Sequence, residues 1–403
     1  MILVILTSLA RGLFGQSLEL TGDELKQYRK ITRRSQTAPD VYSQSTYYLA
    51  SYLTGTANSN LEKTRAIYVW IASNITFDMK GFKSNILPEY RPKAVLNNRY
   101  AVCEGFAQLF NELCAEAGLK TEIIRGYARG FGYENVNNFE VSNHAWNAVL
   151  IDGEWQFIDV TWAARKSNDS YLVRPLEDKY FFTSPEMFIM DHLPEIPAWQ
   201  LLSNPISKAA FENNNIAIVP GSFNYNDSLA NLISMNSSRK AISYQLAARN
   251  FNPENESVTY RLAVEYRFRA LDSLDVVYNI GENELERFTQ LEKSVFSDLD
   301  EAALYFALIK PNSSYYKSAQ DLWDDTEYER GVFKYEVGHR LLDIYHDFPQ
   351  QNKELLRRKY NEMIASYYKE ARSYFSSILK NSYHYDSAQK YLNQYLNNPF
   401  EDY

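Results

Sequence analysis

The sequence predicts an α+β protein in which a cysteine-bearing helix packs on an antiparallel sheet, followed by an all-helical domain. Two observations carry this prediction. Helix and strand patterns alternate up to Trp199, whereas nearly every pattern after Ser228 has the helical period. The chain has 403 residues, which is long for one domain and natural for two.

Two helices are expected in the first part of the chain. Over 61–75 the apolar side chains recur on one helical face, and the same spacing follows Cys103 up to Ala117. Gly118 then stands where a helix commonly ends. The apolar face of the second helix consists of Phe106, Ala107, Phe110, Cys114 and Ala117.

The sheet is expected from two segments that follow this helix. Residues 120–128, "KTEIIRGYA", have a strand pattern, and residues 143–162, "NHAWNAVLIDGEWQFIDVTW", have the pattern of a β-hairpin. Asp152 and Gly153 are suited to the two-residue turn of that hairpin. This register pairs Ile151 with Glu154 and continues to Trp146 and Asp159.

Four segments are predicted along the chain. Residues 1–16 resemble a secretory signal, because their apolar run from Ile2 to Leu9 is similar to the apolar part of such a signal. This run is too short to span a bilayer. The α+β domain then covers 17–205, a linker 206–227 and the helical domain 228–403. We therefore expect an exported protein, in the periplasm, at the cell surface or secreted.

A weak internal repeat occurs in the helical domain. Residues 306–320, "FALIKPNSSYYKSAQ", and 375–389, "FSSILKNSYHYDSAQ", share Phe, Ile, Asn-Ser, Tyr and Ser-Ala-Gln. The offset is about twice the period of 34 residues in tetratricopeptide repeats. A tetratricopeptide-like array and ordinary helix packing are both compatible with this pattern, and either could present a surface for a protein partner.

Composition excludes several functions. The net charge of −8 leaves no basic surface for nucleic acid. Beyond the first residues no apolar stretch approaches the length of about 18 residues that a membrane span needs. No calcium-loop pattern and no metal-ligand spacing of histidines occurs, so neither a metal nor a cofactor is expected.

Cys103 and Cys114 are the only two cysteines. On one helix they would lie about 16 Å apart, too far for a disulfide. Cys114 falls on the apolar face and is expected to be buried. Cys103 opens the helix, where backbone N–H groups and the helix dipole favour a thiolate, so it is the candidate nucleophile.

A candidate base and its orienting carboxylate lie in the hairpin. The predicted register places His144 diagonally across from Asp159 on the same face of the sheet, within side-chain reach. Asp159 could then hold one ring nitrogen while the other faces Cys103, as in a nucleophile–histidine–carboxylate triad. The nearby Trp146, Trp155 and Trp162 could line a groove, although core packing is the more common role of such residues. Asp191 and His192 are expected in a loop.

These motifs resemble the transglutaminase-like superfamily of papain-type cysteine enzymes, bacterial members included. The segments that carry the resemblance are "AVCEGFAQLFNELCAEAGL", "IIRGYARG" and the hairpin, in the chain order Cys, His, Asp. The resemblance covers roughly 60–205. It implies a papain-like core, with Cys103 as the nucleophile, His144 as the base and Asp159 as the orienting residue.

The oxyanion site departs from the family pattern. The backbone N–H of Cys103 would be one donor. The twenty residues before Cys103 contain no Gln, and Arg91, Asn97 and Tyr100 are the available alternatives.

Two functions remain open from the sequence. The first is thiol-dependent acyl transfer on protein or peptide amides, as a peptidase, an amidase or a transglutaminase. The second is a weakly active or inactive scaffold that binds protein or peptide partners. The three matched residues favour the enzyme, and the missing Gln favours the scaffold.

Overall fold

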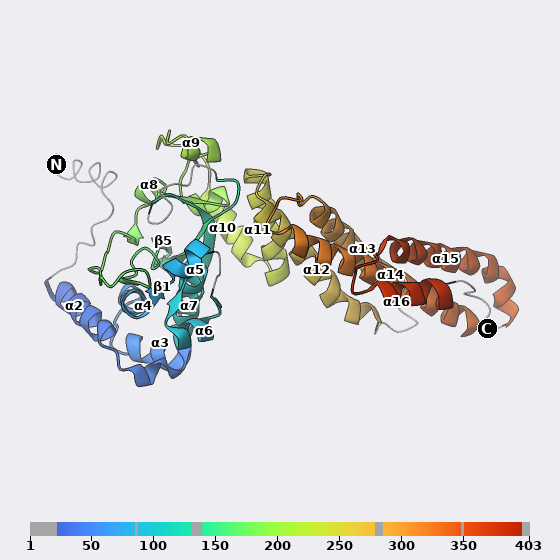
Figure 1. Cartoon of the computed structure of the whole chain (residues 1–403), viewed down its shortest axis with the longest axis horizontal. Coiled ribbons are helices and arrows are strands. Elements are labelled where there is room, and N and C mark those ends of the chain that lie inside the picture. Colours follow the sequence, from blue (N-terminus) through green and yellow to red (C-terminus); the bar gives the residue numbers. More distant parts are fainter. Residues whose placement is uncertain (1–21, 85–87, 131–138, 279–284, 348–349, 397–403) are drawn as a thin grey trace. The chain divides into compact units, whose positions relative to one another are not determined.

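The computed structural model describes residues 22–84, 88–130, 139–278, 285–347 and 350–396. The predicted signal segment 1–16 lies outside these residues. The chain divides into two compact units, Met1–Asn231 and Leu232–Tyr403. Figure 1 labels their elements, with the sheet in the first unit and long helices in the second.

The first unit combines short helices with eight strands in its described residues. The helical elements are α2 (Gly22–Gln36), η2 (Asp40–Gln44), α3 (Thr46–Thr54), α4 (Asn60–Asn74), α5 (Met79–Ser84), α6 (Pro92–Asn98), α7 (Cys103–Glu116), α8 (Pro185–Phe188), η3 (Pro197–Gln200) and α9 (Lys208–Glu212). The strands are β1 (Thr76–Phe77), β2 (Tyr100–Ala101), β3 (Thr121–Ala128), β4 (His144–Ile151), β5 (Glu154–Ile158), β6 (Lys166–Ser167), β7 (Phe181–Thr183) and β8 (His192–Pro194).

The strands form two sheets. The larger sheet has the order β7-β5-β4-β3-β8, and all of its pairs are antiparallel. A small parallel sheet has the order β2-β1-β6 and leads through β2 into α7. The α+β fold that the sequence predicts is confirmed.

The predicted hairpin is confirmed in its turn and register. Ile151 pairs with Glu154, and the ladder runs to Asn147 opposite Ile158. Asp152 and Gly153 have φ angles of 51° and 88°, as a two-residue turn requires. Asp159 is the residue directly after β5, one position beyond Ile158, the last residue of β5 that pairs with β4.

Helix α7 lies against β4, and its apolar face is buried as predicted. Phe106, Phe110 and Cys114 are inaccessible to solvent. The Asn147 amide donates to the carbonyl of Ala107 at 3.1 Å and fixes the helix on the strand. Gly118, at φ 72°, ends the helix as expected. The start of this helix, and therefore Cys103, has a fixed position over the sheet.

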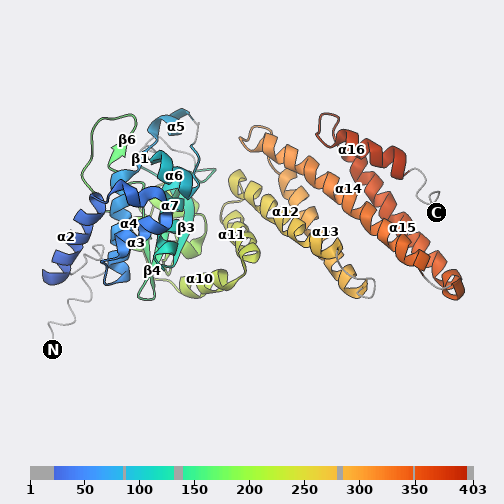
Figure 2. The same cartoon turned by 90° about the horizontal axis from the view of Figure 1, so that it is seen from below.

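The described residues of the second unit contain helices and no strand, which confirms its all-helical class. After α10 (Tyr225–Ser234), which crosses the boundary, come α11 (Ser237–Phe251), α12 (Glu256–Tyr278), α13 (Leu285–Ala307), α14 (Tyr316–Asp347), α15 (Gln350–Ser377), α16 (Tyr385–Lys390) and the π-helix η5 (Tyr391–Tyr395). Helices α12 and α13 pack along each other, as do α14 and α15 (Figure 2).

The internal repeat marks two equivalent helix–turn–helix corners. One joins α13 to α14, and the other joins α15 to α16. The shared Phe, Ile and Ala are buried at both corners, as Phe306, Ile309 and Ala319 and as Phe375, Ile378 and Ala388. A tetratricopeptide repeat places two helices in about 34 residues. Helix α14 alone has 32 residues and α15 has 28, so the repeating unit here is a pair of much longer helices.

The predicted linker 206–227 contains regular structure. Helix α9 lies within it, and Phe211 on that helix is fully buried. The last three linker positions already belong to α10. None of the helices in the described part of the chain combines the length and apolar character that crossing a bilayer requires.

Candidate functional site

Cys103 occupies the first position of α7, with Val102 as the residue before the helix. Its side chain is half-buried, whereas Cys114 is fully buried, and both thiols are free. Burial raises the pKa of the Cys114 thiol well above its usual range. The two cysteines therefore differ as predicted, with Cys103 accessible at the helix start and Cys114 in the core.

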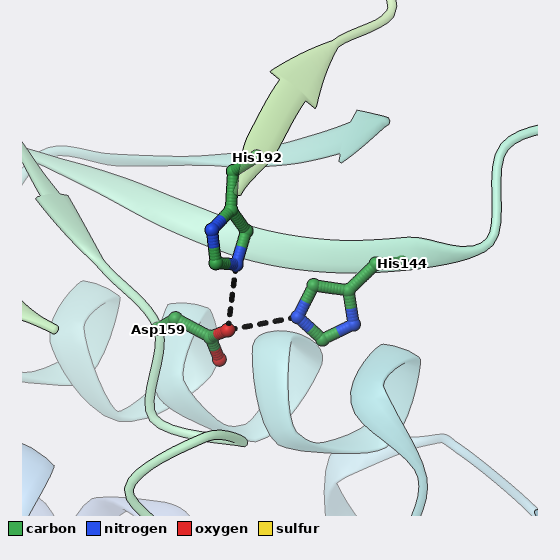
Figure 3. A group of neighbouring side chains, drawn as sticks. All are labelled: His144, Asp159 and His192. Atoms are coloured by element: carbon green, nitrogen blue, oxygen red, sulfur yellow. Dashed lines mark hydrogen bonds and ion pairs between the residues drawn. The ribbon is translucent and has the colours of Figure 1, made fainter. Parts of the chain in front are cut away.

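His144 and Asp159 are in direct contact. The Nε2 of His144 lies 2.8 Å from Oδ2 of Asp159, and neither side chain is exposed to solvent (Figure 3). Because a carboxylate only accepts, Nε2 carries the hydrogen. The Cys103 thiol is among the groups that raise the pKa of the same histidine. The structure thus joins His144 directly to Asp159 and makes Cys103 one of the groups that act on the His144 ring.

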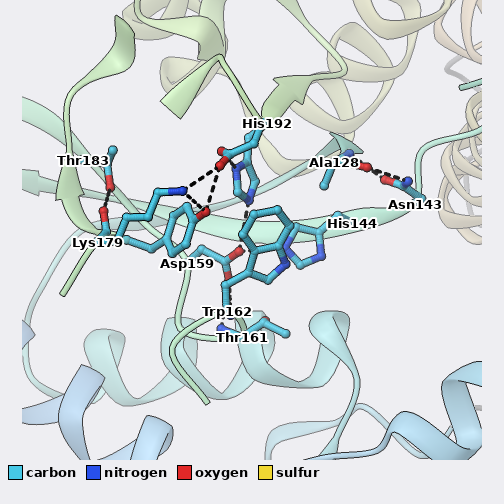
Figure 4. Close-up of polar contacts among 11 residues, drawn as sticks. Ala128, Asn143, His144, Asp159, Thr161, Trp162, Lys179, Thr183 and His192 are labelled. Atoms are coloured by element: carbon cyan, nitrogen blue, oxygen red, sulfur yellow. Dashed lines mark hydrogen bonds and ion pairs between the residues drawn. The ribbon is translucent and has the colours of Figure 1, made fainter. Parts of the chain in front are cut away.

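Asp159 receives four hydrogen bonds. Its Oδ1 accepts from the backbone N–H groups of Thr161 and Trp162, at 2.8 and 3.1 Å. Its Oδ2 accepts from His144 and also lies 3.1 Å from Nε2 of His192 (Figure 4). The backbone donors exist because the chain turns directly after β5. They fix the plane of a carboxylate that has no access to water.

The ionisation of this pair follows from its partners. Burial acts to lower the pKa of His144, but the charge and hydrogen bond of Asp159, helped by Cys103, raise it to about 10. Burial likewise acts to raise the pKa of Asp159, yet the charge of His144 and the donors on both oxygens hold it well below its usual range. At neutral pH the pair is an imidazolium and a carboxylate.

The backbone at the start of β4, where His144 lies, is held in position by hydrogen bonds. The amide of the preceding Asn143 bonds both backbone groups of Ala128, at 2.7 and 3.0 Å, and so continues the β3–β4 ladder with a side chain (Figure 4). His144 itself is paired with Gly126 across this ladder. The imidazole therefore projects from a strand end that is held on both sides of its backbone.

The start of α7 is tied to the same sheet by an ion pair. Glu104, next to Cys103, accepts from Nε and Nη2 of Arg125 on β3, at 3.1 and 2.5 Å. Gln108 donates to the same carboxylate at 2.9 Å. A negative charge in the first helical turn is also favourable to the helix dipole. This pair has no local sequence signal, because no predicted register relates Glu104 on α7 to Arg125 on β3.

Aromatic rings surround the histidine. The His144 ring lies 5.9 Å from Trp146 and 5.5 Å from Trp162 between centroids, and both tryptophans are buried. Trp155 is half-buried and packs edge-on against Trp199, away from these contacts. Trp146 and Trp162 thus shield the His144–Asp159 pair from water, which strengthens the ion pair.

The expectation of a loop holds for Asp191, which lies in a turn, but is wrong for His192. His192 begins β8, which pairs with β3 through Ala128, and the side chain of His192 is completely buried. Its Nδ1 lies 2.6 Å from Oδ1 of Asp191. A three-residue strand is too short to show an alternating pattern. The sequence therefore gave no local signal for a second histidine at the site.

His144, Asp159 and His192 are also close enough to act as metal ligands. In the part of the chain that the structure describes they form the one such group, with ligand atoms within 4.8 Å of one another. The contacts of 2.8 and 3.1 Å from the two Nε2 atoms to Oδ2 have the lengths of N–H···O hydrogen bonds. We therefore interpret the group as a hydrogen-bonded network.

The side chains proposed as oxyanion donors lie at the surface. Arg91 is exposed and bonds the carboxylate of Glu89 at 2.7 Å. Asn97 is exposed, and Tyr100 on β2 has 41% of its surface accessible. The backbone N–H of Cys103, at a helix N-terminus, is the donor that the fold itself supplies.

The arrangement of a half-buried thiol, a buried histidine and a buried carboxylate on this α+β core is typical of papain-type cysteine enzymes. Residues 47–160 match the model of the transglutaminase-like superfamily, and the first unit therefore contains a transglutaminase-like domain.

Two animal proteins and a solved structure are similar to this chain. Kyphoscoliosis peptidase of Mus musculus is 36% identical over 169 residues, which are 41% of this chain and 26% of that protein. Hillarin of Drosophila melanogaster is 32% identical over 186 residues, 41% of this chain and 22% of that protein. A crystal structure described as a TGase has 15% identity, a TM-score of 0.23 and covers 44% of this chain and 40% of its own. The chain matches less than a third of the length of these two relatives.

Proposed function

We propose that the first unit catalyses thiol-dependent acyl transfer on protein or peptide amides, with Cys103, His144 and Asp159 as its triad. The observation that carries the proposal is the direct contact of the His144 ring with the Asp159 carboxylate, together with the effect of the Cys103 thiol on the pKa of the same ring. The peptidase among the relatives is consistent with an amide substrate.

The proposed reaction has two steps. The Cys103 thiolate attacks the amide carbon, and the C–N bond breaks as the His144 imidazolium gives its proton to the leaving amine. This leaves a thioester on Cys103. Water or a primary amine then attacks the thioester, His144 takes its proton, and the thiolate leaves. Asp159 keeps its hydrogen bond to Nε2 throughout and stabilises the charged ring.

The same residues serve hydrolysis and cross-linking. Hydrolysis makes the domain a peptidase or amidase, and an amine acceptor makes it a transglutaminase. The outcome depends on which nucleophile reaches the thioester. The helical second unit is the proposed surface for a protein partner, and a bacterial family type and export stay predictions.

One observation favours the alternative of a binding scaffold. The side chains considered as second oxyanion donors are exposed, and Arg91 is occupied by Glu89. Removing one oxyanion donor costs an enzyme about 10²–10³ in rate. A domain that has the backbone donor alone would bind a peptide and turn it over slowly.

Alkylation of the full chain with iodoacetamide across pH tests the proposal. We expect Cys103 to react alone near pH 6, because Cys114 has no access to the reagent. His144→Ala removes the imidazolium and should move the reactivity curve to higher pH. Peptide mapping by mass spectrometry assigns the modified cysteine at each pH.

The controls separate enzyme from scaffold. Cys103→Ala should remain folded and unlabelled, and EDTA should leave the curve of the unmodified protein unchanged. Equal labelling of both cysteines, or a curve that His144→Ala does not move, would make Cys103 an ordinary thiol and favour the scaffold.

A further inference from the structure

His192 is placed between two carboxylates. Its Nε2 lies 3.1 Å from Oδ2 of Asp159 (Figures 3 and 4). Its Nδ1 lies 2.6 Å from Oδ1 of Asp191. The same Oδ2 of Asp159 accepts from His144. One carboxylate oxygen thus joins two imidazole rings, and the second ring joins two carboxylates.

Each ring nitrogen of His192 faces a carboxylate oxygen. A carboxylate accepts hydrogen bonds and donates none, so each of the two contacts is a hydrogen bond only when the ring nitrogen carries a hydrogen. Both ring nitrogens of His192 have a carboxylate oxygen within hydrogen-bonding distance.

The surroundings of His192 exclude water. Its ring stacks on Phe188 with 4.1 Å between centroids and lies 4.3 Å from Trp162 and 5.1 Å from Trp146. Such an apolar enclosure makes an unpaired charge very costly. The two carboxylates provide the hydrogen-bond partners that this buried ring needs.

The far end of the network reaches the surface. Asp191 Oδ2 accepts from the hydroxyl of Tyr180 at 2.8 Å and from Lys179 at 3.1 Å. The Asp191 side chain has 18% of its surface exposed, and that of Lys179 has 57%. Burial acts to raise the pKa of Asp191, and the hydrogen bond from His192 lowers it. Asp191 is therefore an ionised carboxylate that fixes the outer side of the His192 ring.

We infer that His192 is a positioning residue, which donates to Asp159 and keeps that carboxylate ionised and aimed at His144, while Asp191 fixes the His192 ring. This inference rests on the proposed function, because His192 acts through Asp159 and His144 on the Cys103 thiolate. It adds a second histidine and a second carboxylate to the site.

Two substitutions of equal polarity separate the two contacts of His192. The amide nitrogen of asparagine is attached at the γ carbon, as Nδ1 is in histidine, and can still donate to Asp191. The amide nitrogen of glutamine lies one atom further out, as Nε2 does, and can still donate to Asp159. His192→Asn therefore loses the contact to Asp159, and His192→Gln loses the contact to Asp191.

The pH curve of Cys103 alkylation in the full chain is the readout, with near-UV circular dichroism as the check of folding. We expect His192→Asn to shift the curve upward by about one pH unit, the size of one charge-assisted hydrogen bond. His192→Gln should shift the curve less than His192→Asn, because it keeps the donor to Asp159. Asp191→Asn, at a partly exposed position, keeps an acceptor for Nδ1 but loses the charge, and should shift the curve less, in the same direction.

His384 in the second unit provides a matched control. Its ring stacks on Tyr328 at 4.2 Å, and its Nε2 lies 3.0 Å from Asp325. Like His192, it therefore contacts an aromatic ring and an aspartate, but it lies in the second unit. His384→Asn and His384→Gln should leave the alkylation curve unchanged. A shift in these variants would mean that the readout follows general loss of stability, and would overturn the inference.

The remaining outcomes are distinguishable. Equal shifts in His192→Asn and His192→Gln would show a purely structural histidine. If His192→Asn and Asp191→Asn leave the curve in place while His144→Ala moves it, the inference fails and the proposed triad stands. If His144→Ala also leaves the curve in place, both fail together. Should His192→Asn not fold, Asp191→Asn and His192→Gln decide by the same comparison.

Discussion

At the scale of residues, the site is held together by hydrogen bonds to one buried carboxylate, that of Asp159. It accepts from two backbone N–H groups and from two histidine rings, and its side chain has no contact with solvent. A buried carboxylate with this number of donors remains ionised. The raised pKa of His144, about 10, is the matching response of its partner. The two groups therefore stabilise the folded state by an amount that depends on pH.

The first prediction concerns this dependence. A group whose pKa is raised in the folded protein stabilises it fully below the unfolded value, about 6.5 for histidine, and loses this contribution as pH rises toward the folded value. In Cys103→Ala, which keeps the contact of His144 with Asp159, we expect the free energy of unfolding to fall above pH 6.5. The slope is at most about 1.4 kcal/mol per pH unit. Urea titrations between pH 6 and 10 measure it.

The control is the double variant Cys103→Ala with His144→Gln, which cannot take up the proton. Other groups, such as Cys114, affect both proteins alike, so the difference between the two slopes belongs to His144. Parallel slopes would contradict an imidazolium in the folded state.

At the scale of elements, a glycine permits the close approach of β3, β4 and β8. Gly126 pairs with His144 on one side and with Pro194 on the other. A Cβ at this position would lie 2.6 Å from the Trp146 ring and even closer to the carbonyl of Leu193. The absence of a side chain therefore lets Trp146 pack over the strand that holds the two histidines in place.

The second prediction is that Gly126→Ala destabilises the first unit. The added methyl group must displace an indole ring and a sheet carbonyl, and overpacking of this kind costs about 1–3 kcal/mol. The Cys103 alkylation curve should also move upward, because β4 and β8 carry His144 and His192. Thermal unfolding and alkylation measure the two effects.

Gly22→Ala is the control, since a Cβ at Gly22 would meet nothing within 4 Å. A Gly126→Ala protein with unchanged stability would show that the sheet can widen at this point without cost.

Particular elements show what sequence could predict. The helix after Cys103 and the hairpin turn at Asp152 carry local signals, namely an apolar face and a turn dipeptide, so their positions and the His144–Asp159 contact followed from spacing. Strand β8 carries no such signal, since its three residues owe their conformation to β3, a distant part of the chain. His192 was missed for that reason, and so were the aromatic contacts that enclose it.

At the scale of the whole molecule, each unit has a hydrophobic core of its own. The first core contains Phe106, Phe110 and Val149, from α7 and β4. A separate core in the second unit contains Phe333, Ile364 and Phe375, from α14 and α15. Two cores of this kind predict two unfolding events rather than one.

The last prediction tests this division with one buried phenylalanine in each core. Phe375 is fully buried, stacks on Tyr391 at 4.5 Å and lies so close to Gly331 that a Cβ there would be 2.7 Å from its ring. Phe375→Ala should destabilise the second unit by about 3–5 kcal/mol and leave Cys103 alkylation unchanged. Phe110→Ala, equally buried but on α7, should destabilise the first unit by a similar amount and raise the reactivity of Cys114. Calorimetry of the full chain, with alkylation during heating, assigns each transition to its unit. A single transition that both substitutions lower equally would mean that the two units unfold as one cooperative body.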